Sequence, residues 1–248
     1  MDKEEIREKA LERTRKEIGE TDRIQLMVKA VKSLDQVKSS QKNEMEAFRD
    51  WYSLHFPELE REIEDDEQLV KILSRGVERD ELDAFREMAE GSTGMHLESE
   101  DAEMLESMVD SLKNQQDVVD ELENYVREIA KDEMPNTSIL LGPVLAARIV
   151  HLAGGLEDLA KKPASTVQML GAEKALFKHL REGANPPKHG ILFEHDFVSP
   201  LLSNQRGKMA RFLANKTVMA ARLDQYGDKE KGEELREECR EKFEELKE

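Results

Sequence analysis

Apolar residues recur every seven positions in two long stretches of the chain, and each stretch predicts a helix with one apolar face. The first repeat consists of Met27, Leu34, Gln41, Phe48 and His55, flanked by Val31, Lys38, Met45 and Tyr52. The second consists of Leu105, Leu112, Val119 and Val126, followed three residues later by Met108, Gln115, Leu122 and Ile129. Pro57 ends the first helix, because proline cannot continue one. The simplest arrangement is an antiparallel coiled-coil arm over residues 22–134.

Residues 58–96 lie between the two repeats and predict short helices. The segments "DEQLVKILSRG" and "RDELDAFREMAEG" each end in glycine, a common helix terminator. These helices are expected to form a tip on the arm. Residues 1–21 are charged with few apolar positions, and they predict an extension that is helical or disordered.

The pattern changes after Pro135 to small residues, glycine, proline and fewer charges. "SILLGPVLAARIVHLAGG" predicts one buried helix ended by two glycines, "GAEKALFKHLRE" predicts a helix from Gly171 to Glu182, and "SNQRGKMARFLANKTVMAARLDQYG" predicts a long one. The only strand candidate, "GILFEHDFV", is expected to be a loop. We therefore predict an all-α fold, in which a compact helical domain at 135–227 follows the arm. Residues 228–248 are helical in pattern and are expected to form a charged C-terminal tail.

Composition agrees with long, exposed helices. The 248 residues are 38% charged and 5% aromatic, with a formal net charge of -17. The single cysteine, Cys239, excludes a disulfide framework. The N-terminus has no apolar signal core, and the longest apolar stretch, "ILLGPVLAA", is too short to span a bilayer. A soluble, cytoplasmic protein is expected.

The charge is unevenly distributed. Residues 135–227 hold 12 Lys and Arg against 7 Asp and Glu, a balance of +5, and four of the six histidines. The remaining residues hold 26 against 48, a balance of -22. The acidic total therefore does not exclude a polyanionic partner, which would be met by the basic segment.

The stretch "GAEKALFKHLREGANPPKHG" concentrates this positive charge. On a helix, Lys174, Lys178 and Arg181 share one face, and Leu176, Phe177 and Leu180 can pack on the other side. The helix start at Gly171 and Ala172 leaves backbone N–H groups unshielded, which favours an anion. Lys188 and His189 follow in a loop that Pro186 and Pro187 stiffen. Such a site suits phosphates and unpaired bases.

A solvated amphipathic helix followed by a stiff loop explains the same residues equally well. The next helix adds four cations, which are more often simply solvated: Arg206, Lys208, Arg211 and Lys216. His151 and His179 fit core or surface positions better than ligand positions. His195 and Asp196 could orient each other, but no nucleophile is tied to them.

No catalytic motif is present. A phosphate-binding loop would need glycine six residues before Lys208, where Leu202 stands, and the chain lacks HExxH, CxxC and GxSxG. The sequence therefore predicts no enzyme, metal site or cofactor.

Several segments resemble a known family. "GAEKALF", "PPKHG" and "RGKMARFLANKTVMAARLD" resemble the Nop domain, and "WYSLHFPEL" resembles the end of the first arm helix in the archaeal and nucleolar box C/D guide-RNP core scaffolds. The order of arm, tip, returning arm and Nop domain is also theirs. The resemblance covers residues 22–226.

The resemblance implies an RNA-binding scaffold that recognises kink-turn RNA together with a small ribosomal-protein-like kink-turn-binding protein. It implies self-association through the arm and a role in RNA-guided 2'-O-methylation of rRNA or tRNA. Lys178 stands where the family commonly has arginine, so it keeps the charge but loses the bidentate fork. With the cations identified above, the candidate RNA-binding residues are Gly171, Ala172, Glu173, Lys174, Lys178, Arg181, Pro187, Lys188, His189, Arg206 and Lys208.

The full-length family carries an N-terminal domain that recruits the methyltransferase fibrillarin. Only about twenty charged residues precede the matching region here. We therefore expect a short form without that domain, and the resemblance does not extend to direct fibrillarin recruitment. The alternative is an acidic coiled-coil adaptor that binds proteins only. It predicts no salt-dependent affinity for RNA.

Overall fold

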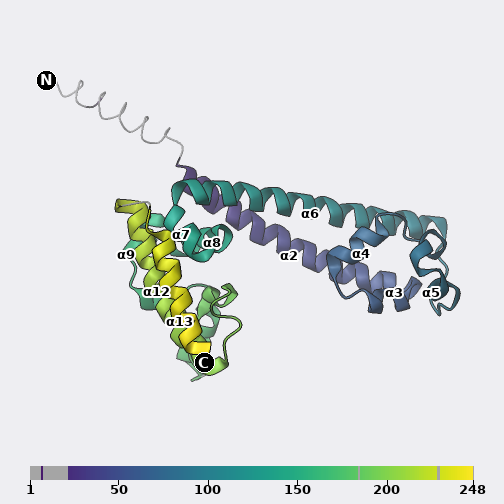
Figure 1. Cartoon of the computed structure of the whole chain (residues 1–248). Helices are drawn as coiled ribbons and strands as arrows, with labels where there is room; N and C mark the ends of the chain where they lie inside the picture. Colours follow the sequence, from purple (N-terminus) through teal and green to yellow (C-terminus); the bar gives the residue numbers. More distant parts are fainter. Residues whose placement is uncertain (1–6, 8–21, 184, 228–229, 248) are drawn as a thin grey trace. The chain divides into compact units, whose positions relative to one another are not determined.

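The computed structural model describes Arg7 and residues 22–183, 185–227 and 230–247, and these divide into two compact units. The arm unit is Lys32–Asn124, and the other unit combines the described residues up to Val31 with those from Tyr125 onward. Helices form every regular element of the described residues, and none of these residues is in a strand. The predicted all-α fold is confirmed (Figure 1).

Two long helices build the arm unit, α2 (Arg23–His55) and α6 (Ser99–Glu133). They run antiparallel, because Lys38 contacts Glu123 at 2.5 Å and Gln41 contacts Gln116 at 2.8 Å. Lys38 and Gln41 are the two polar interruptions of the first heptad repeat, so each finds a polar partner on α6. The apolar members of that repeat are buried: Met27, Val31, Leu34, Met45, Phe48 and Tyr52.

The end of the arm unit is capped by α3 (Pro57–Glu62), α4 (Asp66–Leu73) and α5 (Arg86–Glu90). The first predicted tip helix is confirmed as α4. The second is shorter than predicted, because two 3-10 turns, Arg79–Glu81 and Asp83–Phe85, precede α5. Leu82 lies between these two turns and has non-helical dihedral angles (φ -96°, ψ 67°), so the helix is interrupted there. The side chain of Leu82 is buried at this interruption.

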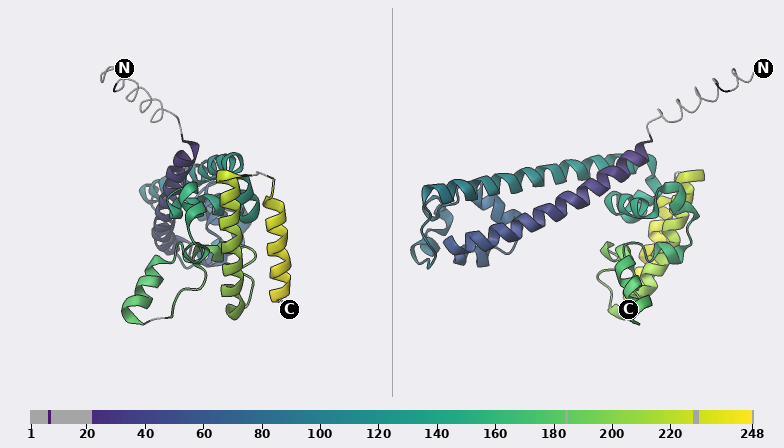
Figure 2. Two further views of the ribbon diagram at one scale, coloured as in Figure 1. Left: turned by 90° about the vertical axis from the view of Figure 1, so that its left-hand side faces the viewer. Right: turned by 180° about the vertical axis from the view of Figure 1, so that it is seen from behind.

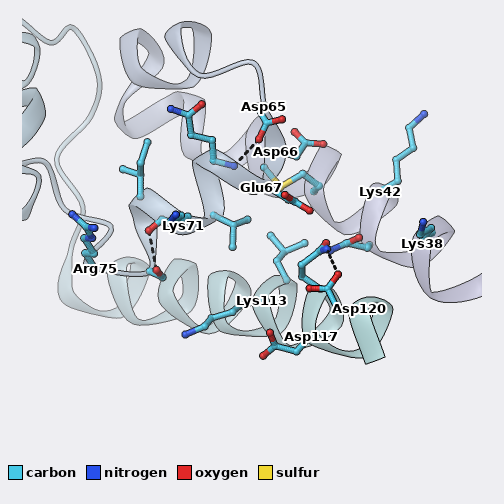
Figure 3. A pocket seen from close by; sticks show the side chains of 18 residues that line it. Lys38, Lys42, Asp65, Asp66, Glu67, Lys71, Arg75, Lys113, Asp117 and Asp120 are labelled. Carbon is cyan, nitrogen blue, oxygen red and sulfur yellow. Dashed lines mark hydrogen bonds between the residues drawn. The ribbon is translucent and has the colours of Figure 1, made fainter. Parts of the chain in front are cut away.

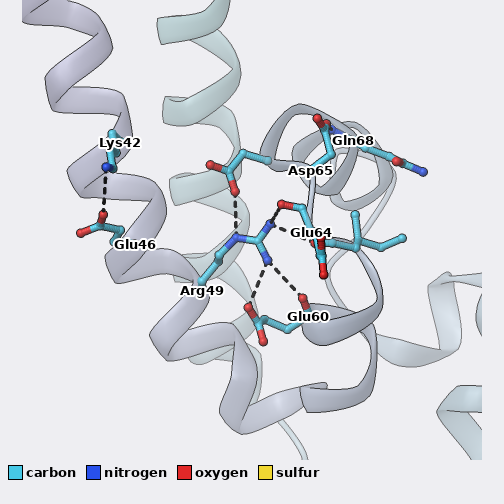
Figure 4. Close-up of polar contacts among 9 residues, drawn as sticks. Lys42, Glu46, Arg49, Glu60, Glu64, Asp65 and Gln68 are labelled. Carbon is cyan, nitrogen blue, oxygen red and sulfur yellow. Dashed lines mark hydrogen bonds and ion pairs between the residues drawn. The ribbon is translucent and has the colours of Figure 1, made fainter. Parts of the chain in front are cut away.

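Arg49 fixes the turn between α3 and α4 (Figure 4). Its guanidinium bonds the Glu60 carboxylate at 3.0 Å and the Asp66 carboxylate at 2.8 Å. It also donates to three backbone carbonyls, those of Glu60, Ile63 and Glu64. The half-buried side chain of Arg49 on α2 thereby fixes the orientation of α3 and α4 relative to α2.

A groove of about 1030 Å³ lies among α2, α4 and α6 (Figure 3). Its floor includes the apolar side chains of Met45, Val70 and Leu112. Its walls carry five cationic and five anionic side chains: Lys38, Lys42, Lys71, Arg75, Lys113, Asp65, Asp66, Glu67, Asp117 and Asp120. This balance gives the groove no preference for ligands of either sign.

The second unit begins with α7 (Pro135–Leu141) and α8 (Pro143–Ala153), which meet at a bend of 114°. The sequence analysis predicted a single helix here, and that prediction is wrong. Pro143 lacks the N–H needed to continue the helix, and Gly142 has a φ of 79° that suits a break. Both helices bury most of their residues.

The other helices of this unit gather around α12 (Ser203–Tyr226). It packs against α7, α9 (Leu156–Lys161), α10 (Ala164–Val167) and α13 (Gly232–Lys247). Its inward face is made of buried small and aliphatic residues: Met209, Ala210, Leu213, Ala214, Val218, Ala220 and Ala221. The strand candidate "GILFEHDFV" begins with a 3-10 turn, Gly190–Glu194, which contacts α12.

The segment predicted as a charged tail contains helix α13, which is part of the packed domain. Leu235, Cys239 and Leu246 are buried, and the Phe243 ring lies 5.5 Å from that of Phe197. At its start, the Lys231 N–H donates to the Asn136 side-chain oxygen at 2.9 Å. A methyl group on Gly232 would lie 3.0 Å from Ile139, so α13 approaches α7 closely. The many charged residues of α13 suggested a solvated surface, although the helix also carries apolar residues at helical spacing.

No single helix among the described residues is both long and apolar enough to cross a membrane; α7 and α8 meet that test only as a bent pair.

Candidate nucleic-acid interface

Helix α11, Glu173–Glu182, carries the basic stretch and buries none of its residues. Leu176, Phe177 and Leu180 are 36%, 61% and 70% exposed. The sequence pattern allowed these three side chains to pack against the domain, but they remain exposed. In the left view of Figure 2, α11 is the green helix at the lower left, and it stands apart from the other helices of its unit. It thus presents an apolar face as well as a basic face.

The basic face of α11 is formed by Lys174, Lys178 and Arg181, which are all exposed. Their spacing places them on one side of the helix. Within the described part of the chain, none of the three forms an ion pair. Their charges are therefore available to an anionic ligand.

The start of α11 is partly occupied by its own carboxylate. Gly171 has a φ of 78°, and its N–H donates to the Glu173 carboxylate at 2.9 Å. The N–H of Ala172 donates to the carbonyl of Met169 at 3.1 Å. Glu173 therefore stabilises the turn into the helix and competes with any anion for the Gly171 N–H. The next N–H groups of the first turn have no intrahelical acceptor.

Gln168 connects the loop that follows α11 to the start of α12 through two hydrogen bonds, and we call this segment the fastened loop. The Gln168 side-chain amide donates to the carbonyl of Lys188 at 2.6 Å and to that of Gly207 at 3.3 Å. Gly190 has a φ of 48°, and a methyl group there would lie 2.3 Å from the carbonyl oxygen of Leu170. Only glycine fits at this position. The loop thereby presents the Lys188 side chain beside Gly207.

Phe193 joins the loop and α12 through its ring. The His189 ring stacks on it with centroids 4.9 Å apart, and the Arg206 guanidinium lies 5.1 Å from its centroid. Arg206 is held further by donating to the Leu201 carbonyl at 2.7 Å. The aromatic ring, the imidazole and the guanidinium together form a surface on which a base could stack.

His189 contributes to this cluster through the stacking of its ring on Phe193. Burial, with the positive charges of Arg206 and Lys188, lowers the pKa of His189 below its usual value. The imidazole is therefore neutral at pH 7.

Pro187, Lys188 and His189 lie on the fastened loop, and the Phe193 ring brings His189 together with Arg206 of α12. Lys208 and Arg211 are exposed on α12 without an ion pair among the described residues. No bond in those residues joins Lys174, Lys178 or Arg181 to this loop. Lys216, also considered a contact, forms an ion pair with Glu238 of α13 and is 12% exposed, so it serves the packing of α13.

Sequence reasoning missed Gln168 and Phe193. The available signal was weak: one polar residue in a short helix and one aromatic residue in a turn. Their importance comes from contacts with residues 20 or more positions away, or from ring stacking across a turn. Neither relationship has a periodicity that a linear pattern could reveal.

His195 is a structural residue, and His151 has a buried ring nitrogen. Buried His195 donates from Nε2 to the Leu140 carbonyl at 3.1 Å and accepts the Phe197 N–H at Nδ1 at 3.0 Å. Burial lowers the pKa of His195, which agrees with this neutral tautomer. Nδ1 of His151 is buried without a hydrogen-bond partner in the described residues. The orientation of His195 therefore comes from backbone groups rather than from Asp196.

A family model described as "Nop: snoRNA binding domain, fibrillarin" matches residues 33–245. A NOP5 family protein of Methanocaldococcus jannaschii is 40% identical over 197 residues, covering 74% of this chain and 48% of that protein. Human nucleolar protein 56 is 31% identical over 239 residues, covering 88% of this chain and 40% of that protein. The chain thus spans about half the length of these relatives, or less.

The chain is also similar in structure to a protein in a solved fibrillarin/Nop5p complex. The TM-score is 0.57 at 25% sequence identity, and the match covers 90% of this chain and 69% of that one.

Proposed function

Because the chain belongs to the Nop family of snoRNA-binding proteins, we propose that it is the RNA-binding scaffold of a box C/D-type guide ribonucleoprotein. It recognises kink-turn RNA together with a small kink-turn-binding protein, and it supports RNA-guided 2'-O-methylation of rRNA or tRNA in the cytoplasm. It does no chemistry itself.

The observation that carries this proposal is the exposure of α11. Its cations form no ion pairs in the described residues, and Phe177 and Leu180 lie 61% and 70% exposed on the same helix. An amphipathic helix without a partner in its own chain is expected to bury its apolar face against another molecule. A composite of RNA and protein satisfies both faces: phosphates meet Lys174 and Lys178, and the small protein meets the apolar side.

The fastened loop supplies the second part of the interface. Lys188 meets a phosphate, and Phe193, His189 and Arg206 meet an unpaired base. Residues outside 135–227 have a charge balance of -22, which repels RNA. The chain alone should therefore bind naked RNA weakly, and the pre-formed RNA–protein complex much more tightly.

A gel-shift series tests this function. Kink-turn RNA is titrated with the chain in the presence and absence of the small kink-turn binder, at several salt concentrations. We expect a shift only with the binder and an affinity that falls as salt rises. An RNA with its kink-turn disrupted is the matched control. Equal binding to both RNAs, or none with the binder present, would contradict the proposal and favour the adaptor without RNA binding.

We also propose that two copies associate through the arm. A hollow of about 550 Å³ on one side of the arm unit is lined by seven residues, of which only Asp110 is charged: Val37, Ser107, Asp110, Ser111, Asn114, Gln115 and Val118. Val118 is 44% exposed, and Oε1 of Gln115 is buried without a hydrogen-bond partner in the described residues. In a chain that is 38% charged, such a face suits a second copy.

Sedimentation equilibrium tests this association. The chain should sediment as a dimer, and Val118→Glu should shift it towards a monomer. Lys113→Glu, which changes an exposed residue on the same helix outside this hollow, is the control.

A further inference from the structure

The loop at the end of the arm unit, Gly91–Leu97, is fastened on one side by Glu58. The Glu58 carboxylate accepts the Ser92 hydroxyl at 2.7 Å, and both the N–H and the hydroxyl of Thr93 at 2.9 Å. A methyl group on Gly94 would lie 1.8 Å from the carbonyl oxygen of His55, so the loop backbone lies directly against α2. The loop has little freedom to move.

The other side of the loop is held through the backbone of Met95. Its N–H donates to the Leu54 carbonyl at 2.8 Å. Its carbonyl accepts from Nδ1 of His55 at 2.9 Å and from Arg79 at 3.1 Å. Every backbone hydrogen-bonding group of Met95 is thereby used, and its side chain is left 64% exposed.

This backbone arrangement creates a fixed apolar surface, the tip patch, made of Trp51, Leu54 and Met95. Leu54 is 57% exposed and Trp51 is 38% exposed. Trp51 and Leu54 lie three residues apart on α2, so they share a face, and Met95 bonds to the backbone of Leu54. Tryptophan and methionine are enriched in the centres of protein interfaces. Preorganisation also reduces the entropy lost on binding.

The chain segment that contains Met95 of the tip patch is strongly acidic. Residues 77–106 contain eleven Asp and Glu against two Arg, a balance of -9. Both arginines are engaged internally: Arg79 bonds the carbonyls of Gly94 and Met95, and Arg86 pairs with Asp83 at 2.5 Å. The patch therefore repels nucleic acid and attracts a positively charged protein surface.

A hollow of about 550 Å³ adjoins the tip patch, because its lining includes His55 and His96, the neighbours of Leu54 and Met95. Asp80 and Glu90 also line it and are exposed without an ion pair in the described residues. His55 is 4% exposed, and its Nε2 has no hydrogen-bond partner there. Nδ1 donates to a carbonyl, so Nε2 is an acceptor. Four carboxylates line the hollow, those of Glu78, Asp80, Asp83 and Glu90, and its two arginines, Arg79 and Arg86, are already engaged internally. This excess of negative charge suits a cationic side chain.

We propose that the tip patch and its hollow bind a Lys/Arg-bearing amphipathic segment of a partner protein. The apolar face of the segment covers Leu54, Met95 and Trp51, and one of its cations enters the hollow beside Asp80 and Glu90. The site is independent of RNA binding by α11, so the arm recruits a basic protein to the ribonucleoprotein.

Trp51 is the only tryptophan in the chain, so its fluorescence reports directly on the patch. The probe is a synthetic helical peptide with leucine on one face and lysine on the other, titrated into the full chain. We expect a saturable change in emission at one peptide per chain, weakening as salt rises. The same peptide with glutamate in place of lysine is the control and should give no change.

Substitutions in the chain test whether the peptide binds at this site or is held only by general attraction between opposite charges. Leu54→Ser with Met95→Ser should weaken binding at least tenfold, and Asp80→Asn with Glu90→Gln should do the same while reducing the salt dependence. Leu202→Ser alters an equally exposed apolar residue of the other unit and should have no effect. Circular dichroism checks that all variants keep their helix content.

Three results would overturn the proposal. The first is an equal response to the glutamate peptide, and the second is binding that survives both pairs of substitutions. The third is a change in Trp51 emission that follows protein concentration without any peptide, because this would show that a second copy of the chain covers the patch.

Discussion

Thr137 and Asp224 lie 87 positions apart in the sequence and are joined by two hydrogen bonds, from the Thr137 hydroxyl at 2.6 Å and its N–H at 2.9 Å. The same carboxylate accepts the N–H of Asn136 at 2.9 Å and its side-chain amide at 2.8 Å. Asp224 on α12 therefore caps the start of α7, which has no capping side chain of its own. The contact is buried, since Thr137 is 0% and Asp224 is 9% exposed.

Asp224→Ala should lower the free energy of unfolding by about 3 kcal/mol, because it leaves several buried donors without an acceptor. Asp224→Asn should cost less, since one acceptor oxygen remains. Urea denaturation measures both effects. Glu241→Ala, an exposed change on α13, should stay within about 0.5 kcal/mol of the parent. An equally small effect for Asp224→Ala would show that water replaces the lost carboxylate.

Gly190→Ala and Gly183→Ala separate backbone strain from steric overlap. Both glycines have positive φ, 48° and 68°, but a methyl group meets the Leu170 carbonyl only at Gly190 and finds open space at Gly183. Gly183→Ala should cost about 1 kcal/mol from the left-handed backbone alone. Gly190→Ala should cost about 2 kcal/mol more and displace the loop. Thermal unfolding measures the difference, and equal costs would contradict the assigned contact.

Lys174→Glu with Lys178→Glu should weaken assembly on the RNA–protein complex by about 100-fold or more, because charge-assisted contacts of about 1.5–3 kcal/mol each are lost. Gel shifts measure the affinity, and circular dichroism should show unchanged helix content. Lys29→Glu with Lys32→Glu makes the same charge change on exposed residues of α2 and is the control. Unaltered assembly in the α11 variant would remove these residues from the interface.

Phe177→Ala should leave stability within about 0.5 kcal/mol of the parent, because the side chain is 61% exposed and α11 is not packed. Binding to the RNA–protein complex should nevertheless fall about tenfold or more, as expected for an aromatic anchor. Leu213→Ala offers the opposite control: this residue is fully buried, and its loss should cost about 2–5 kcal/mol. A stability loss for Phe177→Ala without a binding loss would mean that α11 packs on its own domain.

The attachment of the Gly91–Leu97 loop should fail in acid. The Thr93 N–H, followed by the Ser92 hydroxyl, lowers the pKa of the Glu58 carboxyl from 4.5 to about 2. The folded-state pKa is the lower one, so the stabilisation is complete above 4.5 and is lost as the pH falls towards 2. The protection of the Thr93 amide against hydrogen exchange, relative to the intrinsic rate at each pH, should fall across that range. Glu58→Gln should weaken the attachment at neutral pH and remove the pH dependence.

Much of the fold follows from local pattern. The heptad residues Leu105, Leu112 and Val119 are buried as their spacing predicts. The break at Pro143 follows from a local rule that the strong apolar character of the surrounding segment obscured. The packing of helix α13 on the domain was missed for a related reason, since the charges around Leu235 and Cys239 suggested a solvated surface.

The candidate site was only partly predictable. The spacing of Lys174, Lys178 and Arg181 identified one face of α11 correctly, but amphipathic character indicates burial without saying against which molecule. The sequence pattern therefore could not show that Phe177 and Leu180 stay exposed in this chain. The cluster around Phe193 depends on tertiary contacts that have no linear signature.

The hydrogen bond between Lys231 and Asn136 has a consequence for biosynthesis. The first helix of the C-terminal domain is completed by a residue made 95 positions later. A growing polypeptide on the ribosome therefore cannot form this contact until Lys231 has been synthesised and has left the exit tunnel. Until then, the apolar side chains of α7 and α8 stay exposed and need protection from contact with other nascent chains.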